Sequence, residues 1–227
     1  LKENTVHTGK HFVFGFSSKR INELIQELRN KEKIKKLGIH FHRKTQNVSE
    51  WSLKEELQDS LTKETLEQID LVNIGGGIPS IYKNYELKAI NSIFTKIKEL
   101  KIWLNQNNIK MIVEPGRFIA APSIKLETTI KNVYKGNIIV DASVYNSAMD
   151  TFISNIRLNV EGETTAQEGE PYTIKGCTPD SMDIFRYRVF LKNEPKIGDK
   201  ITFLNAGAYN FSTDFCRLSK IPTKVVD

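Results

Sequence analysis

The sequence has few of the features that mark secreted, metal-binding or membrane proteins. Its 227 residues include only two cysteines, Cys177 and Cys216, which lie in different segments and form no CxxC pair. This spacing argues against a disulfide scaffold or a zinc site and is typical of a reducing compartment, so we expect a cytoplasmic protein without a bound metal. There is no long apolar run, so the sequence predicts no membrane span and no membrane partner.

The excess of basic residues lacks the pattern of a nucleic-acid-binding protein. The formal net charge is +6, within a composition of 39% hydrophobic and 26% charged residues that is typical of globular proteins. The lysines lie among glutamates on helix faces, as in Lys96–Lys101, and no stretch interleaves basic with aromatic residues. We therefore expect no nucleic-acid partner.

Three consecutive glycines form the stretch around which the rest of the sequence is best interpreted. A short apolar run ends in Gly75, Gly76 and Gly77, and a helical pattern follows soon afterwards. Glycine lets backbone N–H groups approach an anion, and a following helix adds the positive end of its dipole, so such a turn can hold a phosphate. The alternative is a strand-to-helix turn whose glycines serve tight packing.

Strands and helices alternate over the first half of the chain. The hydrophobic pattern indicates helices near 18–33, 51–69 and 87–100, and strands at 37–42, 71–74 and 109–113. About three such repeats predict a parallel α/β unit, in which functional residues follow the carboxyl ends of the strands. Because His42, Gly75–Gly77 and Glu114–Arg117 all follow strands, we expect them to share one rim.

After residue 117 the pattern changes to short β-rich segments separated by turn residues, without a strong helix among them. This pattern predicts a separate antiparallel β domain. We therefore expect two domains, a partial (β/α) barrel over residues 1–118 and a β domain over residues 119–227.

The residues at the expected rim match the chemical needs of pyridoxal phosphate. A Gly-rich turn with Arg117 can bind a phosphate, Glu114 can keep a ring nitrogen protonated, and His42 can lie flat on an aromatic ring. Taken singly, each residue has a simpler explanation, since Glu114 and Arg117 could pair with each other and His42 could be a core histidine. Their joint occurrence at successive strand ends favours the cofactor site.

Five motifs lie in the same order along the chain, namely Gly38–His42, Asn73–Gly77, Glu114–Arg117, Gly176–Asp183 and Asn205–Tyr209. In order and spacing they resemble those of the ornithine, diaminopimelate and arginine decarboxylase family, which pairs a TIM-type barrel with a β domain. The resemblance implies an α/β fold, the C-terminal part of a TIM-type (β/α) barrel followed by the β domain. It also implies pyridoxal phosphate as cofactor and the decarboxylation of an amino acid, expected to be a basic or diamino one such as ornithine, lysine, arginine or diaminopimelate.

The resemblance also implies roles at the cofactor. His42 resembles the histidine that stacks on the cofactor ring, and Glu114 resembles the acidic partner of the pyridine nitrogen. Phosphate contacts are implied for the following residues: Thr45, Gly75, Gly76, Gly77 and Tyr209. Arg117 resembles a phosphate-binding or structural arginine.

The resemblance implies two further roles in the β domain. Asp180 resembles the acidic residue that enters the partner subunit's site in a homodimer with shared active sites and meets the distal amine of the substrate. Where the family has a cysteine just before this acid, the chain has Pro179, which cannot donate a proton. Cys177 could replace that donor, or it could simply be a small buried residue.

The chain holds no counterpart of the family's Schiff-base lysine, which lies upstream of the histidine strand, and a complete barrel needs roughly 250 residues. We therefore expect the C-terminal portion of a longer decarboxylase, or one piece of a split enzyme. A non-catalytic decarboxylase-like protein that binds a regulator or partner chain is the alternative, and a racemase of the same architecture is a weaker one.

Overall fold

The computed structural model describes residues 15–85, 87–210, 213–214 and 217–226. The chain divides into two compact units, the first made of Leu1–Pro79 with Leu87–Gly116 and the second of Ser80–Glu86 with Arg117–Asp227. The short segment 80–86 therefore belongs to the second unit although the first unit flanks it in the sequence. The predicted division, with a single boundary after residue 118, does not include this assignment of segment 80–86 to the second unit.

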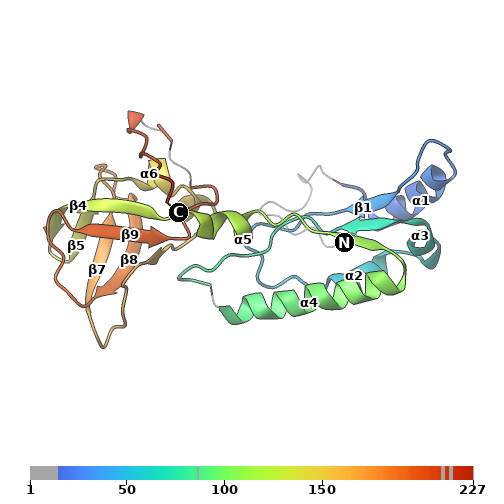
Figure 1. Ribbon diagram of the computed structural model, residues 1–227, viewed down its shortest axis with the longest axis horizontal. Coiled ribbons are helices and arrows are strands. Elements are labelled where there is room, and N and C mark those ends of the chain that lie inside the picture. The colour runs from blue at the N-terminus through green and yellow to red at the C-terminus, as the bar shows by residue number, and fades with distance from the viewer. Residues whose placement is uncertain (1–14, 86, 211–212, 215–216, 227) are drawn as a thin grey trace. The chain divides into compact units, whose positions relative to one another are not determined.

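The first unit is a parallel α/β unit. Its elements are α1 (Ser18–Arg29), β1 (Gly38–His40), α2 (Leu53–Ser60), α3 (Lys63–Gln68), β2 (Leu71–Asn73), α4 (Leu87–Gln106) and β3 (Lys110–Ile112). The strands of this unit, coloured blue to green in Figure 1, form a parallel sheet in the order β1-β2-β3. Ile39 pairs with Val72, and Val72 pairs with Met111. Sequential order and parallel pairing are those of consecutive repeats in a (β/α) barrel, as the sequence predicted.

Side-chain capping explains where α1 and α3 begin. The Ser17 hydroxyl accepts a hydrogen bond from the Arg20 N–H at 3.3 Å and begins α1. The Thr62 hydroxyl does the same for the Thr65 N–H at 3.2 Å, so the single helix expected over 51–69 is divided into α2 and α3. Within the described residues, no helix combines the length and the apolar character needed to cross a bilayer.

The second unit is dominated by a six-stranded sheet in the order β6-β9-β4-β5-β7-β8. Its elements are α5 (Arg117–Ala120), η1 (Ala121–Ser123), β4 (Leu126–Tyr134), β5 (Asn137–Val140), α6 (Val144–Ser147), α7 (Asp150–Ile153), β6 (Asn159–Val160), β7 (Glu170–Lys175), β8 (Ile184–Leu191) and β9 (Lys200–Leu204). Four of the five strand pairs are antiparallel, but β5 and β7 run parallel. The sheet is thus mixed, whereas the sequence predicted an antiparallel domain.

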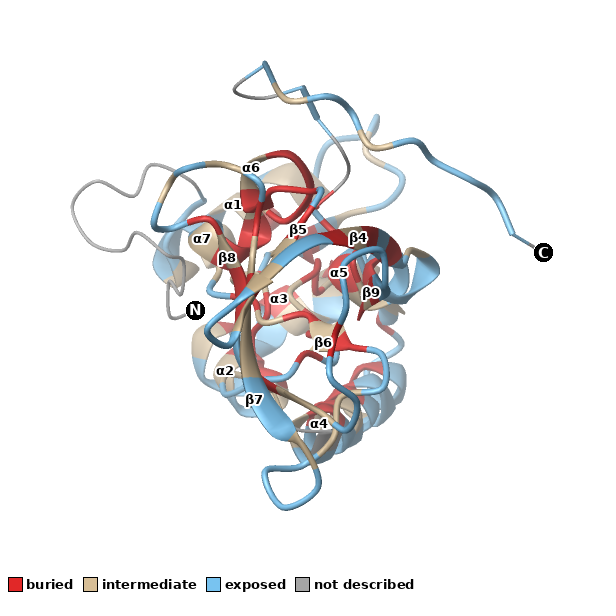
Figure 2. Cartoon of the chain, turned by 90° about the vertical axis from the view of Figure 1, so that its left-hand side faces the viewer, coloured by how far each residue is buried: buried red, intermediate tan, exposed pale blue. Residues whose placement is uncertain are grey.

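Alternate residues of these strands build the core of the second unit. Phe185 on β8 and Phe203 on β9 are fully buried and stack with their ring centroids 4.8 Å apart. Buried residues of β4, β8 and β9 are drawn in red in Figure 2. At the edge of the core, Glu163, whose side chain is 6% exposed, pairs with Arg186 at 2.8 Å and with Lys83 at 2.9 Å. Through Glu163, Lys83 is thereby connected to Arg186 on β8.

Candidate active site

The carboxyl ends of the three parallel strands meet at one rim of the first unit. The backbone N–H of Phe41, after β1, donates to the carbonyl of Asn73 at 3.1 Å, and the N–H of Glu114, after β3, donates to the carbonyl of Gly75 at 2.8 Å. The structure therefore brings together His42, the glycines and Glu114, as the strand pattern predicted. It does so because parallel strands in register end at the same edge of a sheet.

Asn73, the last residue of β2, organises this rim. Its side-chain oxygen accepts a hydrogen bond from the Gly75 N–H at 2.9 Å, and its Nδ2 donates to Glu114 Oε1 at 2.7 Å. The asparagine thus fixes both the glycine turn and one oxygen of the carboxylate. Asn73 belongs to the motif Asn73–Gly77, but no role was predicted for it, although its position directly before the glycines was a usable signal.

His42 and Glu114 lie on the surface of the first unit, next to each other. The side-chain nitrogens of His40 and His42 and a carboxylate oxygen of Glu114 are within 4.8 Å of one another, and all three residues are exposed. His42 Nδ1 accepts a hydrogen bond from the Gly76 N–H at 3.3 Å, so the proton of the neutral ring is on Nε2. His42 is therefore no core histidine. Because this spacing also suits a divalent cation, the predicted absence of a metal stays a prediction.

The three glycines allow the strand ends to approach one another. A Cβ on Gly75, whose φ is +64°, would lie 2.4 Å from the Phe41 carbonyl oxygen, and a Cβ on Gly76 would lie 2.9 Å from His42 Cε1. The N–H groups of Gly75 and Gly76 are engaged by Asn73 and His42. Tight packing therefore explains these two glycines directly, and their contact with a phosphate stays a prediction.

We expect Gly75→Ala to lower the free energy of unfolding by more than about 2 kcal/mol, because it combines backbone strain of about 1–2 kcal/mol with a steric clash. Gly162 has a φ of +76° but no heavy atom within 4 Å of an added Cβ, so Gly162→Ala measures the strain alone. Urea unfolding of the two variants separates the contribution of backbone strain from that of the steric clash. If both variants lose the same free energy of unfolding, the close approach of Gly75 to the Phe41 carbonyl contributes no destabilisation of its own.

Arg117 lies in the second unit, where it is almost fully buried. Its guanidinium forms an ion pair with Asp150, and its NH1 donates to the Tyr82 hydroxyl at 3.2 Å. The side chains of Arg117 and Asp150 are 3% and 2% exposed. Burial is the largest single effect and lowers the pKa of Arg117, but the hydrogen bonds and charges of Asp150 and Tyr82 together raise it by more, so the guanidinium stays charged. From the sequence, a pair between Glu114 and Arg117 was left open; in the structure, Arg117 forms an ion pair with Asp150.

Tyr209 lies beside this ion pair. Its ring centroid is 5.0 Å from the Arg117 Cζ, its side chain is exposed, and its backbone has a φ of +58°. A positive φ is costly for a tyrosine and is found where surrounding contacts impose it. The next residue supplies one such contact, since Asn210 Oδ1 accepts a hydrogen bond from the Asp150 N–H at 3.0 Å. Arg117 and Tyr209 are therefore brought together from segments 92 residues apart.

The loop between β7 and β8 carries Cys177 and Asp180. Asp183, which is fully buried, accepts hydrogen bonds from the Val144 N–H at 2.8 Å and the Thr178 N–H at 3.1 Å and thereby shapes the loop. Asp180 accepts a hydrogen bond from the Tyr145 hydroxyl and another from the Met182 N–H at 2.8 Å. Both bonds, that of Tyr145 most strongly, lower the pKa of Asp180 and keep the carboxylate charged.

Cys177 is exposed rather than a small buried core residue, and its N–H donates to the Ala142 carbonyl at 2.9 Å. Partial desolvation, followed in size by the charge of Asp183, raises the pKa of the thiol. The thiol is therefore protonated at neutral pH, which is the form that can give up a proton. Pro179, between Cys177 and Asp180, is exposed. In the first unit, Thr45 lies in the segment after β1 and is half-buried.

We expect Tyr145→Phe to raise the pKa of Asp180 toward its ordinary value of 3.8, because the variant removes the strongest hydrogen bond to the charged form. A lowered pKa in the folded state stabilises the fold above the unfolded pKa, and this contribution is lost as the pH falls through the folded pKa. NMR titration of the Asp180 carboxyl carbon in both proteins measures the change. An unaltered pKa in the variant would contradict the assigned hydrogen bond.

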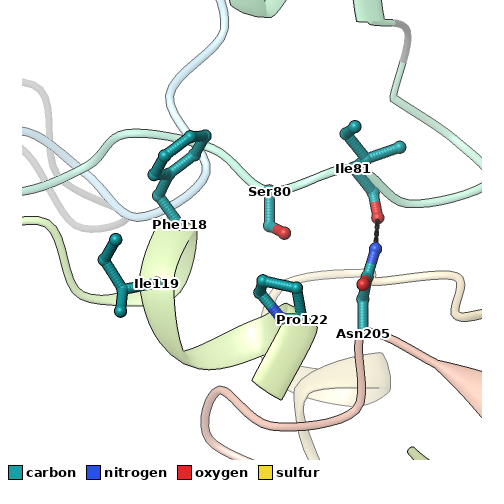
Figure 3. Close-up of a pocket in the computed structure, with 6 residues that line it drawn as sticks. All are labelled: Ser80, Ile81, Phe118, Ile119, Pro122 and Asn205. Atoms are coloured by element: carbon teal, nitrogen blue, oxygen red, sulfur yellow. Dashed lines mark hydrogen bonds between the residues drawn. The ribbon is translucent and has the colours of Figure 1, made fainter. Parts of the chain in front are cut away.

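The second unit also has an open, mostly apolar pocket of about 420 Å³. Figure 3 shows its lining residues, Ser80, Ile81, Phe118, Ile119, Pro122 and Asn205. Asn205 Nδ2 donates to the Ile81 carbonyl at 2.7 Å, which holds segment 80–86 against the loop after β9. Among the described residues that line this pocket, none is predicted for the site and none has a titratable side chain.

The chain thus combines a parallel α/β unit of barrel type with a separate β-sheet unit, and each unit carries its own group of polar side chains. A family model described as the pyridoxal binding domain of pyridoxal-dependent decarboxylases matches residues 2–121, and the C-terminal sheet domain of the same enzymes matches residues 119–207. The chain belongs to the pyridoxal-dependent decarboxylase family. Pyridoxal phosphate is the cofactor of this family.

Individual relatives agree with this assignment. The chain is 24% identical to a probable ornithine decarboxylase of Dictyostelium discoideum, over 88% of this chain and 48% of that protein. It is 26% identical to the L-glutamyl-[BtrI acyl-carrier protein] decarboxylase of Niallia circulans, over 88% of this chain and 51% of that protein. The chain therefore spans about half the length of the curated relatives that it matches.

Solved structures show the same fold. A lysine/ornithine decarboxylase of Vibrio vulnificus in complex with cadaverine superposes with a TM-score of 0.70 at 23% identity, covering 91% of this chain and 58% of that one. A diaminopimelate decarboxylase variant of Helicobacter pylori in complex with L-lysine gives a TM-score of 0.72 at 23% identity, covering 93% and 55%. The predicted combination of a partial barrel and a sheet domain is confirmed.

Proposed function

We propose that this chain supplies cofactor- and substrate-binding parts of a pyridoxal-phosphate-dependent decarboxylase that acts on a basic or diamino acid. The observation that carries the proposal is the rim of the first unit, where the exposed imidazole of His42 lies beside the carboxylate of Glu114, which Asn73 fixes. An aromatic ring face and a fixed anion suit a pyridinium ring. The Schiff-base lysine is expected upstream of residue 1.

The donor groups of the second unit suit the other end of the cofactor. Arg117 and Tyr209 lie together and offer a guanidinium and a phenol, the donor chemistry that binds a phosphate. Taken separately, the residues of each unit therefore fit the chemistry of one end of the cofactor. When bound, pyridoxal phosphate supplies an electron sink for the charge that remains after loss of carbon dioxide. In this proposal Glu114 keeps the ring nitrogen protonated, His42 covers the ring, and Arg117 and Tyr209 hold the phosphate.

The loop between β7 and β8 is proposed to serve the substrate. The carboxylate of Asp180 is charged and is oriented by Tyr145, so it can bind the distal ammonium group of a diamino acid. The protonated thiol of Cys177 is the proposed proton donor. We also propose that the native protein is a cytoplasmic homodimer in which Asp180 acts in the partner's site, a proposal that rests on the family resemblance.

The alternative function is a non-catalytic decarboxylase-like protein that binds a regulator or a partner chain. One observation favours it, because Pro179 stands where the family resemblance implies a proton-donating cysteine, and proline has no acidic proton. The two functions differ in whether carbon dioxide is released.

Release of carbon dioxide from candidate substrates tests the proposal. The native protein that carries this chain is saturated with pyridoxal phosphate and incubated separately with ornithine, lysine, arginine, diaminopimelate and glutamate. We expect release from one of the basic or diamino acids and far less from glutamate, which lacks a distal ammonium group. Binding of the cofactor without release from any of them would favour the non-catalytic alternative. Release from glutamate alone would contradict the role of Asp180.

A further inference from the structure

Asn210 carries a buried hydrogen-bond donor without an acceptor. Its side chain is 5% exposed, and among the residues that the structure describes its Nδ2 has no hydrogen-bond partner. The orientation of the amide is not arbitrary, because Oδ1 accepts a hydrogen bond from the Asp150 N–H at 3.0 Å and an N–H group can face only the oxygen. Buried donors in folded proteins are normally satisfied, so this one indicates an acceptor that binds there.

The surroundings of Asn210 indicate the charge of that acceptor. Asp150 touches Asn210 through its backbone N–H and Arg117 through its carboxylate, and the ring of Tyr209, next to Asn210 in the chain, lies on the guanidinium. Three donor side chains are therefore gathered in one place. The carboxylate of Asp150 is compensated by its pair with Arg117. Such a set of donors suits an anion with several oxygens.

We propose that Asn210 is a further binding residue for the phosphate of the cofactor, donating through Nδ2. The hydrogen bond between the Asp150 N–H and Oδ1 holds its amide in the required orientation. This inference rests on the proposed function and deepens it, because it adds to the phosphate site a residue that the sequence motifs did not indicate. Asp150 then has two effects, since it fixes the guanidinium of Arg117 and the amide of Asn210.

The test compares pyridoxal phosphate with pyridoxal, which lacks the phosphate. Equilibrium dialysis with the cofactor-free native protein gives the dissociation constant of each compound. Asn210→Asp keeps the shape and the acceptor for the Asp150 N–H but replaces the donor with a second carboxylate oxygen. We expect it to weaken the binding of pyridoxal phosphate at least about 10-fold, the effect of one hydrogen bond to a charged group, and to leave that of pyridoxal within about 2-fold.

Two further variants keep the result interpretable. Asn210→Ser retains a hydroxyl that can accept from the Asp150 N–H, adds no charge and removes the amide donor, so it decides the question if Asn210→Asp does not fold. Asn205→Asp makes the same chemical change elsewhere in the same loop, at a half-buried residue whose Nδ2 donates to the Ile81 carbonyl. We expect this control to bind both compounds as the wild type does.

Three other outcomes would contradict either this inference or the proposed function on which it rests. If a folded Asn210→Ser protein binds pyridoxal phosphate as tightly as the wild type, the amide donor does not contact the phosphate and the inference is wrong. Equal weakening of pyridoxal and pyridoxal phosphate would show a general structural effect and would also overturn it. If the wild type binds neither compound, the proposed function itself fails, a result that the wild-type measurement alone identifies.

Discussion

Glu114→Gln is expected to reduce the turnover of the cofactor-loaded native enzyme by about 100-fold or more, while the affinity for pyridoxal phosphate changes much less. The side chain keeps its shape, and the amide oxygen can still accept from Asn73 Nδ2, as Oε1 does at 2.7 Å. The amide is neutral, however, so it cannot stabilise a proton on the ring nitrogen. Because the phosphate contributes separately to cofactor binding, we expect the substitution to lower kcat much more than the affinity for pyridoxal phosphate.

The matched control for this prediction is Glu67→Gln on α3. Glu67 is 64% exposed and pairs only loosely with Lys63 at 3.8 Å, so the same change there should leave kcat and cofactor affinity as they are. The comparison requires kcat from carbon dioxide release and the dissociation constant of the cofactor for each protein. Unchanged turnover in Glu114→Gln would remove Glu114 from the proposed mechanism.

The rim of the first unit could be predicted because each part of it is recognisable from a short, continuous stretch of sequence. Each of its chemical groups directly follows an apolar run, and runs that alternate with helical patterns predict parallel strands that end at one edge. Sequence reasoning therefore placed His42, the glycines and Glu114 together. It could not decide what the glycines do, since a phosphate turn and a close approach of backbones require the same residue.

The arrangement of the second unit could not be predicted in the same way. Arg117 follows Glu114 by only three residues, yet its charge is taken up by Asp150, and no local pattern marks that partner. Likewise β5 pairs in parallel with β7 across a crossover that contains α6, α7 and β6. Such pairings depend on which side chains fill the core, which strand propensity does not encode.

Asp150→Ala should lower the free energy of unfolding by about 3–5 kcal/mol, because it removes the buried carboxylate that pairs with the guanidinium of Arg117. The bond from Arg117 to the Tyr82 hydroxyl at 3.2 Å remains but is neutral and cannot replace the carboxylate. Urea unfolding of the cofactor-free native protein measures the loss. Glu161→Ala is the control, since its pair with Lys125 lies on the surface, with side chains 53% and 60% exposed, and should contribute no more than about 1 kcal/mol.

A double variant separates the charge from the packing. Asp150→Ala combined with Arg117→Met removes both charges of the ion pair, and replacing both members of a buried ion pair with apolar groups is often neutral or stabilising. We expect the double variant to recover most of the stability lost in Asp150→Ala, while the affinity for pyridoxal phosphate falls because a phosphate donor is gone. A double variant as unstable as the single one would mean that Asp150 acts through its packing, and its control of the Arg117 charge would have to be abandoned.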